Sequence, residues 1–504
     1  MIDEQQKKSL NLDSELIDID EDKEEETCIE INKINILDST IFTNSDFKEL
    51  IKPYLNRCNG IKNLSNLRDK ISNKYIDKGY VTSRAYFKVG DLTTKELNIY
   101  ILEGKIEKIE SGNVNISNLF INYENKILNL RDLEVLVQQA ERLQSQQLDI
   151  QLIPSQKIGY TEINIVNNGP LESFFGNIGV NNFGLKKTGK YQIYSNFSYE
   201  NLFKINDIIS LNLNSTNRAL TTNDKTIGAY INYSFPIDRF LFDLFYSYSN
   251  YKQANQDNFS STFQSNGDNY SFGLDISYKL FHSFQHSIEI FLGYEKKQTK
   301  NYLNDVRLDL QSYNTSSLST GFKHNYRAES FDYYSKIMVK KGLAGYKDDI
   351  SQQDIYFTKY LFDLGFNKYF NTANNLKYNF YLRSQYSSNN LLATEEISMG
   401  GVYSVRGFND SELSGNKGFY TRNELSQTYK IDSLFILPYL GVDYGYVSNN
   451  TYSVGGELYG FVVGSRAYIK DFNLELFYSV PLKASANIKD ENSKFLGFSL
   501  SYNF

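Results

Sequence analysis

From about residue 170 to the end of the chain, apolar and polar residues alternate in runs of about 9–12 residues. A period of two residues indicates β-strands with one face toward an apolar medium and the other toward a polar one. About sixteen such runs follow one another, separated by loops rich in Asn, Ser, Asp and Gly. The last run, FLGFSLSYNF, alternates without a fault, and its apolar face consists of Leu496, Phe498, Leu500, Tyr502 and Phe504.

Two classes of protein produce this alternation, a soluble β-sandwich and a transmembrane β-barrel. Sandwich strands average about 5–6 residues, whereas tilted strands that cross a bilayer need about 9–11. The 41 Tyr and 35 Phe residues crowd the ends of the runs, as aromatic girdles do at membrane interfaces. We therefore predict an antiparallel transmembrane β-barrel of about 16 strands over residues 170–504, surrounded by outer-membrane lipid and closed by Phe504.

Composition excludes other classes. The net charge of -6 argues against a nucleic-acid-binding protein, which normally carries a basic face. No run approaches the roughly 18 apolar residues that a membrane-spanning helix needs. Residues 1–26 are polar, end in the acidic run IDIDEDKEEE and contain no apolar core of a signal peptide. We interpret them as a solvated acidic tail or linker.

Residues 27–103 and 104–169 predict two α+β domains in tandem with the element order β-α-α-β-β, an internal repeat. In the first domain we expect two helices, the second of which ends at the C-cap glycine Gly79, and strands at 29–37, 80–87 and 96–104. In the second domain we expect strands at 105–111, 146–153 and 160–166 and a helix over 129–144.

The two cysteines, Cys28 and Cys58, lie before the first predicted strand and after the first predicted helix. Their number alone fits two idle thiols of a reduced protein equally well. Antiparallel packing of that helix on the sheet would bring the two residues together. In an oxidising compartment we predict a disulfide that closes a loop of about 30 residues and stabilises the fold by roughly 3–4 kcal/mol.

The loop 389–417 is predicted to have a function, because loops of this length are uncommon otherwise. It contains the stretch GGVYSVRGF, in which Arg406 stands among Val405, Gly407 and Phe408. These neighbours predict that the guanidinium is buried, and a buried guanidinium needs a carboxylate partner.

Asp443 is the best candidate for that partner. It lies in LPYLGVDYGYV, where the alternation places it opposite the apolar face, beside two glycines. On a barrel the opposite face is the lumen, and glycines there let a second segment approach the wall. We predict a loop folded into the pore and held by an Arg406–Asp443 pair.

The stretch SMGGVYSVRGFNDSELSGNKGFYTRNEL, followed by YLGVDYG, resembles the outer-membrane transporters of two-partner secretion, the haemolysin-activation and filamentous-haemagglutinin exporters. NKYIDKGYVTSRAYF is similar to the core of their first POTRA domain, and LNLRDLEVLVQQAERLQS to the helix of their second. The paired cysteines match the haemolysin-type branch. The resemblance implies a Gram-negative outer-membrane barrel of sixteen strands, two POTRA domains in the periplasm, and an extracellular loop whose arginine pairs with a barrel-wall aspartate.

This resemblance further implies a function, the export of one large exoprotein, an adhesin, cytolysin or contact-dependent toxin, in unfolded form. The POTRA domains would bind this partner by β-augmentation, with the expected edges at 80–87 and 146–153. We expect insertion by the barrel-assembly machinery, a monomer, and no cofactor, metal, nucleic acid or catalysis. His282 and His286 are too far apart along a strand for one metal.

Two alternative functions remain, one inside the group of proteins that the chain resembles and one outside it. A barrel insertase shares the barrel and the VRG loop, but usually carries more POTRA repeats than the two found here. A passive porin would explain neither the tandem repeats nor the in-folded loop. Relatives often carry an N-terminal plug helix, for which EQQKKSLNLDSEL offers at best a short helix.

Overall fold

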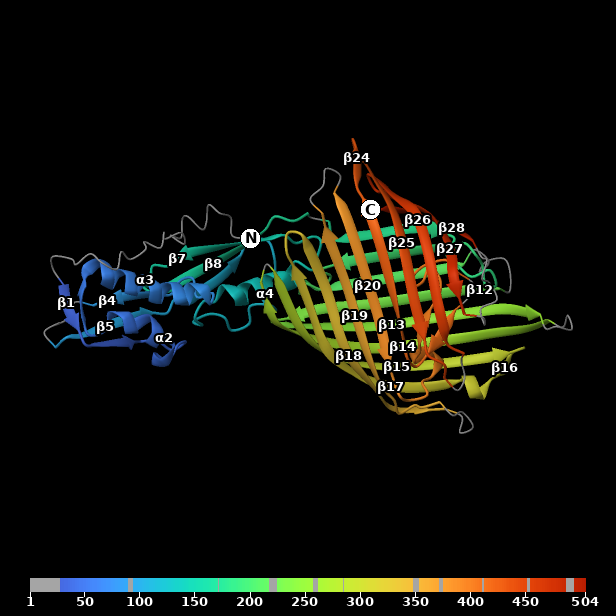
Figure 1. Ribbon diagram of the computed structural model, residues 1–504, viewed down its shortest axis with the longest axis horizontal. Coiled ribbons are helices and arrows are strands. Elements are labelled where there is room, and N and C mark those ends of the chain that lie inside the picture. Colours follow the sequence, from blue (N-terminus) through green and yellow to red (C-terminus); the bar gives the residue numbers. More distant parts are fainter. Residues whose placement is uncertain are drawn as a thin grey trace. The chain divides into compact units, whose positions relative to one another are not determined.

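The computed structural model describes residues 28–88, 94–170, 172–216, 224–256, 262–283, 285–347, 353–370, 375–409, 412–450, 454–485 and 494–504. The predicted acidic tail lies outside these residues. The chain forms two compact units, Met1–Leu171 and Glu172–Phe504 (Figure 1). Within the described ranges, no helix has the length and apolar character required to cross a membrane.

The first domain is a three-stranded sheet covered by two helices. Its strand order is β2 (Lys33–Leu37), β5 (Glu96–Leu102) and β4 (Arg84–Phe87), with β2 parallel to β5 and β4 antiparallel to it. Helices α2 (Asn44–Ile51) and α3 (Ile61–Asp77), with the short 3₁₀ turn η1 (Lys52–Tyr54), supply the apolar side chains of the core. The fully buried members of this core are Ile31, Phe47, Leu67, Ile71, Tyr75 and Ile99.

Two predictions for this domain are wrong in detail. The predicted strand 29–37 is two strands, because the chain breaks at Asn32 and β1 (Cys28–Ile31) pairs with β3 (Arg57–Gly60) in a separate ribbon. The predicted strand 80–87 begins only at Arg84, since the preceding residues form a turn. Gly79 follows α3 with φ +94°, the left-handed conformation that ends many helices.

The second domain repeats the sheet but not both helices. Its strand order is β6 (Lys105–Ser111), β8 (Tyr160–Asn167) and β7 (Leu148–Pro154). Helix α4 (Leu130–Ala140) begins after Asn129, whose side chain accepts a hydrogen bond from the Arg131 amide. The predicted β-α-α-β-β order is wrong here, because residues 112–129 form turns rather than a helix. Four side chains of this turn segment nevertheless fill the core, Ile116, Leu119, Tyr123 and Leu128.

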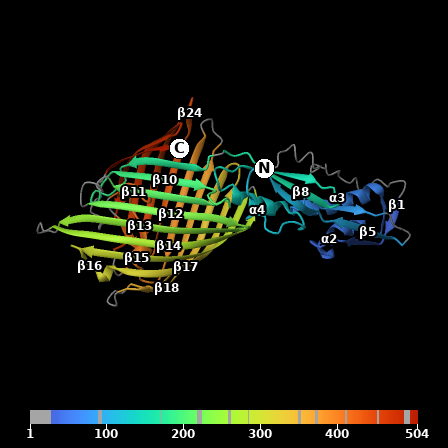
Figure 2. The ribbon, with the colours of Figure 1, turned by 180° about the vertical axis from the view of Figure 1, so that it is seen from behind.

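The second unit is a closed antiparallel barrel of sixteen long strands (Figures 1 and 2). Its strands are β9 (Phe174–Asn181), β10 (Gln192–Glu200), β11 (Ile208–Thr216), β12 (Lys225–Ile237), β13 (Phe240–Gln256), β14 (Thr262–His282), β15 (His286–Leu303), β17 (Tyr313–Arg327), β18 (Phe331–Tyr346), β19 (Thr358–Tyr369), β20 (Leu376–Tyr386), β23 (Gly418–Gln427), β25 (Leu434–Val447), β26 (Gly456–Ile469), β27 (Phe472–Ala484) and β28 (Phe495–Asn503). Two short strands, β16 (Val306–Arg307) and β24 (Tyr429–Ile431), and the 3₁₀ turn η3 (Asp309–Gln311) extend individual hairpins. The predicted fold class is confirmed.

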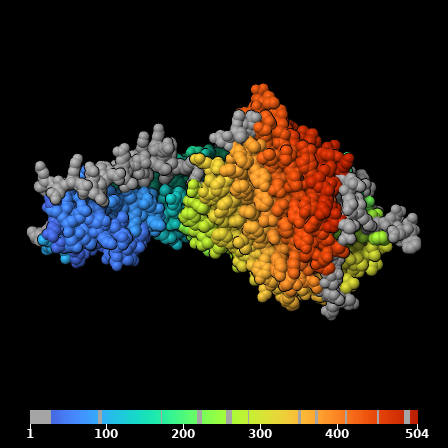
Figure 3. All heavy atoms as spheres, in the orientation of Figure 1, coloured from blue at the N-terminus to red at the C-terminus, as the bar shows by residue number. Residues whose placement is uncertain are grey.

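The predicted alternation separates the two faces of the barrel wall. Apolar side chains such as Leu292, Leu440 and Leu496 are 52 %, 50 % and 66 % exposed on the outer face. The space-filling view shows this face as a continuous wall from β17 (yellow) to β27 (red) (Figure 3). Closed barrels satisfy every wall strand without water, so the apolar exterior suits a lipid environment.

Phe504 completes the closure between the last strand and the first. Its backbone N–H donates to the Gly176 carbonyl at 3.0 Å, and its carbonyl accepts from the Gly176 N–H at 2.9 Å. The ring lies 5.7 Å from that of Phe174 and 6.2 Å from that of Phe197, between centroids. The C-terminal residue therefore extends the pairing of β28 with β9.

Candidate functional site

The segment between β20 and β23 folds inside the barrel. It contains a 3₁₀ turn, η4 (Ala393–Glu395), and a two-stranded hairpin of β21 (Ile397–Met399) and β22 (Leu413–Gly415). Its apolar side chains are buried against Tyr420, Val447 and Leu458 of the wall. The most deeply buried of these side chains are Leu391, Leu392, Met399, Val405 and Phe408, each at most 1 % exposed. We call the described residues 387–409 and 412–417 the pore loop.

Arg406 lies at the centre of the pore loop and binds Asp443 of β25. Its Nε donates to Asp443 Oδ2 at 2.6 Å, its Nη2 to Oδ1 at 2.8 Å, and its backbone N–H to Oδ2 at 3.0 Å. The side chains of Arg406 and Asp443 are 3 % and 0 % exposed. Two parallel charge-assisted bonds fix the direction of the guanidinium as well as its charge. The sequence-predicted pair is therefore in contact in the structure.

A second carboxylate, not among the residues predicted from the sequence, binds the same guanidinium. Arg406 Nη1 donates to Glu424 Oε2 of β23 at 3.0 Å, and Arg466 of β26 binds the same carboxylate from the other side. Arg466 Nε also donates to Glu475 of β27 at 3.0 Å. We call Arg406, Glu424 and Asp443 the Arg406 anchor. Glu424 could have been found from the sequence, because it lies on the polar face of GFYTRNELSQ.

Wall glycines make room for the pore loop. A Cβ on Gly460 of β26 would lie 1.9 Å from the Arg406 carbonyl oxygen, and one on Gly445 of β25 would lie 2.4 Å from Met399 Sδ. Gly407 has φ +105°, and a side chain there would meet the Val480 backbone at 2.7 Å. The predicted role of glycines beside Asp443 thus extends to a neighbouring strand and to the loop itself.

A second contact set holds the pore loop on the opposite part of its course. Glu395, 2 % exposed, binds three lysine ammonium groups, at 2.8 Å (Lys297), 2.9 Å (Lys340) and 2.9 Å (Lys359). The lysines come from β15, β18 and β19, and Lys340 and Lys359 are direct cross-strand neighbours. Like charges in that position repel one another, so the carboxylate between them stabilises both loop and wall. We call this set the Glu395 anchor.

Sequence reasoning missed the Glu395 anchor because its residues are dispersed. The three lysines lie on three strands and the carboxylate on a loop, and no spacing in the sequence joins them. Only their parity, toward the lumen on each strand, was a usable signal. The pore loop is therefore held by buried charges at two separate points, one more than predicted.

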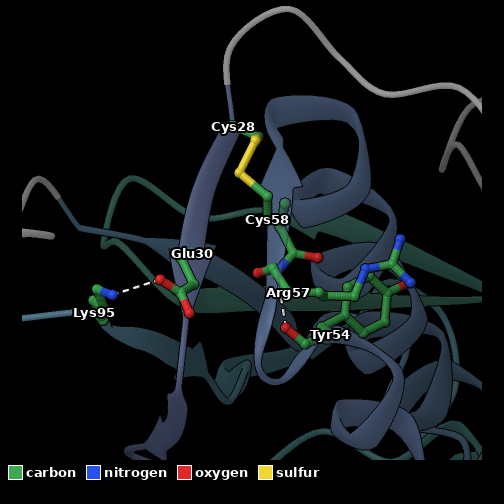
Figure 4. Close-up of a disulfide and its surroundings, with 7 residues drawn as sticks. Cys28, Glu30, Tyr54, Arg57, Cys58 and Lys95 are labelled. Carbon is green, nitrogen blue, oxygen red and sulfur yellow. Dashed lines mark hydrogen bonds and ion pairs between the residues drawn. A yellow bond between two sulfur atoms is a disulfide. The ribbon is translucent and has the colours of Figure 1, made fainter.

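The disulfide Cys28–Cys58 is present, with a Cα–Cα distance of 5.3 Å (Figure 4). The prediction of the pair is confirmed, but the reason given for it is wrong. Cys58 lies on β3 and faces β1 across an antiparallel ribbon, rather than at the end of a helix packed on the sheet. Beside it, Glu30 of β1 forms an ion pair with Lys95 (Figure 4).

The histidines lie at the ends of strands and in the barrel wall. His282 ends β14 and His286 begins β15, and the His286 Nδ1 lies 3.1 Å from His324 Nε2 of β17. Among the described residues, no group of three or more His, Cys, Asp or Glu side chains is arranged to hold a metal ion.

Comparison with known proteins places the chain in a family. Residues 159–467 match the haemolysin secretion/activation protein family ShlB/FhaC/HecB, residues 29–104 match a ShlB-type POTRA domain, and residues 105–154 match a POTRA domain. The chain belongs to this family.

Individual relatives agree with this assignment. The outer membrane transporter CdiB of Dickeya dadantii (strain 3937) is 30 % identical over 457 residues, which cover 87 % of this chain and 80 % of the relative. The hemolysin transporter protein HpmB of Proteus mirabilis is 29 % identical over 438 residues, 85 % and 77 % of the two chains. The structure of CdiB from Escherichia coli shares the fold, with a TM-score of 0.88 at 24 % identity over 99 % of this chain and 95 % of that one.

Membership in the ShlB/FhaC/HecB family decides between the alternatives left open by the sequence. The chain is an outer-membrane transporter of two-partner secretion with periplasmic POTRA domains, and not an enzyme. Its barrel and loop alone would have fitted an insertase equally well. For a ShlB-type transporter, the pore loop and its two anchors are the candidate functional site.

Proposed function

We propose that this transporter binds a large exoprotein of the haemolysin or adhesin type in the periplasm and threads it, unfolded, through the barrel lumen to the cell surface. The observation that carries this proposal is the pore loop, which occupies the lumen and is held there by buried charge pairs instead of continuous strand pairing. Such a loop can move without opening the barrel wall. Relatives named as hemolysin transporters and as heme/hemopexin transporters support the choice of a protein cargo.

We further propose that residues 27–103 and 104–169 are the two cargo-binding POTRA domains. Each domain has a three-stranded sheet with an antiparallel strand at one edge, β4 in the first domain and β7 in the second. An edge strand offers unpaired N–H and C=O groups to an extended partner. β4 lies within the predicted edge 80–87, and β7 overlaps the predicted edge 146–153 and ends one residue beyond it, which supports cargo binding by β-augmentation.

The Arg406 anchor is proposed to hold the pore loop in its resting position. A buried ion pair contributes little net stability over an apolar pair, but loss of one partner is strongly unfavourable. The pair therefore selects one loop position rather than making the barrel stable as a whole. Movement of the loop during export requires the transient loss of these bonds.

The energy for export has to come from the cargo itself. The sequence contains no GxxxxGK[ST] stretch that could cradle nucleotide phosphates. Folding of the exoprotein at the cell surface would stabilise the exported state relative to the unfolded chain in the periplasm, and so would prevent its return.

Deletion of the gene tests the proposal. We expect a large exoprotein, encoded beside the transporter gene, to accumulate in the periplasm while other outer-membrane proteins keep their amounts. Immunoblots of periplasmic and secreted fractions, with total outer-membrane profiles as the control, measure both. General loss of outer-membrane proteins would instead indicate a barrel insertase and would contradict the proposal.

A further inference from the structure

One side of the barrel lumen contains an open cavity of about 530 Å³. Strands β9 to β13 and β28 form its wall, and Tyr403 of the pore loop borders it with a 70 % exposed side chain. Its lining consists of amides, hydroxyls, aromatic rings, small residues and Leu213, and none of the sixteen lining side chains is charged.

The lumen-facing positions on this part of the wall share one character. Asn196 of β10 lies directly opposite Asn177 of β9 and Asn212 of β11, and its Nδ2 donates to Asn177 Oδ1 at 2.8 Å. Asn212 in turn lies opposite Tyr230 of β12. Among the described lumen-facing residues of β9 to β12, one side chain is charged, Glu200, which is 2 % exposed at the end of β10. We call the lumen-facing surface of β9 to β12 the neutral wall.

The rest of the lumen is different. The Glu395 anchor, the Arg406 anchor and the pairs Lys279–Glu289 and Arg383–Asp363 all lie on β14 to β27 or on the pore loop. A smaller cavity of about 200 Å³ on that side is lined by charged groups, among them Lys323, Lys336 and Glu295. The charges that hold the pore loop therefore lie on other strands than the neutral wall. Two carboxylates border that wall: Asp243 of β13 accepts a hydrogen bond from Asn232 of β12, and Glu475 of β27 lies opposite Ser499 of β28.

We propose that the neutral wall is the surface along which the cargo passes as an extended polypeptide; this inference rests on the proposed export function. A pore conducts only if its contacts are favourable enough for entry and weak enough for exit. In a confined lumen of low effective dielectric, a fixed charge would hold an oppositely charged residue of the cargo and repel a like one.

The chemistry of the neutral wall avoids both effects. Side-chain amides and hydroxyls donate and accept hydrogen bonds, so they can replace water around any peptide group of a passing chain. Rings such as Tyr230 and Tyr403 contact apolar and polar residues alike. The wall therefore fits an unfolded polypeptide of mixed sequence and does not select one residue type. Shallow contacts of this kind let a passing chain leave as readily as it enters.

Single-channel recording of the purified full-length protein in planar bilayers tests the inference without the natural cargo. The probe is a synthetic peptide of Gly, Ser, Asn and Thr with evenly spaced lysines, added to the periplasmic side. Asn212→Asp introduces a carboxylate on the neutral wall, and Ser319→Asp introduces one on β17, in the charged cavity. Retained heat-modifiable migration shows that both variants form barrels.

We expect Asn212→Asp to lengthen the peptide-induced current blocks at least about tenfold, the effect of roughly 1.4 kcal/mol. Asn212→Lys should shorten them, and Ser319→Asp should leave them within about twofold of the parent protein. Equal block times for Asn212→Asp and the parent, or a larger effect of Ser319→Asp, would overturn the inference.

An export assay in cells separates this inference from the proposed function. If Asn212→Asp lengthens the blocks while the unaltered chain exports no exoprotein, the neutral wall is a polypeptide-binding surface, but the proposed function fails and with it the assignment of the exoprotein as cargo. If the unaltered chain exports the exoprotein and Asn212→Asp leaves the blocks unchanged, the function stands and the neutral wall fails.

Discussion

Replacement of Arg406 by alanine tests whether the Arg406 anchor determines the position of the pore loop. The guanidinium makes three charge-assisted bonds from its side chain, two to Asp443 and one to Glu424, and all three groups are buried. Removal of one partner from such a set costs about 3–5 kcal/mol, because it leaves buried charge without compensation. At 1.4 kcal/mol for each factor of ten, the docked population of the loop tip falls roughly 100- to 5,000-fold relative to the free one.

Amide hydrogen exchange of the full-length protein in detergent measures this change at residues 400–409. We expect faster exchange there in Arg406→Ala, while residues around Glu395 keep their protection because the Glu395 anchor is intact. Glu395→Gln should give the reverse pattern. Arg406→Lys is the matched control, since it keeps the charge but loses the forked geometry, and should be intermediate.

Export should follow loop position in the same variants. We expect Arg406→Ala to lower secretion of the exoprotein while the barrel still inserts into the outer membrane. Unchanged exchange at residues 400–409, or normal export from a correctly inserted Arg406→Ala protein, would refute the reasoning.

Three further predictions concern other parts of the chain. In Gly460→Ala, the new Cβ overpacks against the Arg406 carbonyl and should destabilise the docked position of the pore loop by about 1–3 kcal/mol. Gly365→Ala should not affect the loop, because no atom lies within 4 Å of its new Cβ. Hydrogen-exchange protection of the loop in the two variants measures the difference. Joint replacement of Cys28 and Cys58 by serine should destabilise the first domain by about 3–4 kcal/mol in urea, and mass spectrometry that finds two free thiols in the native protein would contradict the disulfide. Burial raises the pKa of Tyr75, and the hydrogen bond between Tyr75 and Ser39 acts in the opposite direction. The unfolded chain therefore ionises this phenol first, stability falls as the pH rises above about 10, and Tyr75→Phe should flatten that fall in pH-dependent unfolding.

The barrel and the Arg406–Asp443 pair were predictable because each follows from local alternation. A strand has only two faces, so the parity of Asp443 relative to Leu440 and Val442 fixes its direction toward the lumen. Glu424 could also have been found from the parity of its strand. The Glu395 anchor was not predictable, since its assembly depends on where the pore loop lies and not on any one strand. A sequence pattern shows which way a side chain points, but not which distant side chain it meets.

The errors in the POTRA domains have a similar origin. The continuous β-like stretch 29–37 divides at Asn32, whose backbone N–H binds the Lys95 carbonyl, and its first half joins a different ribbon. In the second domain the turns at 112–129 take the place of the first helix. Ile116 and Leu119 reach the core from these turns, so the apolar pattern is satisfied without a helix. In both cases tertiary contacts override a local preference.

The closure of the barrel has a consequence for how the protein is made. Neighbouring long strands of the barrel are consecutive in the chain, except for the first and the last, β9 and β28. The hydrogen bond from the Phe498 backbone N–H to Asn182 Oδ1, which joins these two ends of the barrel, spans 316 residues. Contacts of such sequence separation form late, because the entropy of closing the intervening chain is lost first. Until the last strand is synthesised, β9 presents an unpaired edge, a template for wrong pairing. During assembly, closure of the barrel therefore competes kinetically with aggregation, and a chaperone that covers the β9 edge would favour closure.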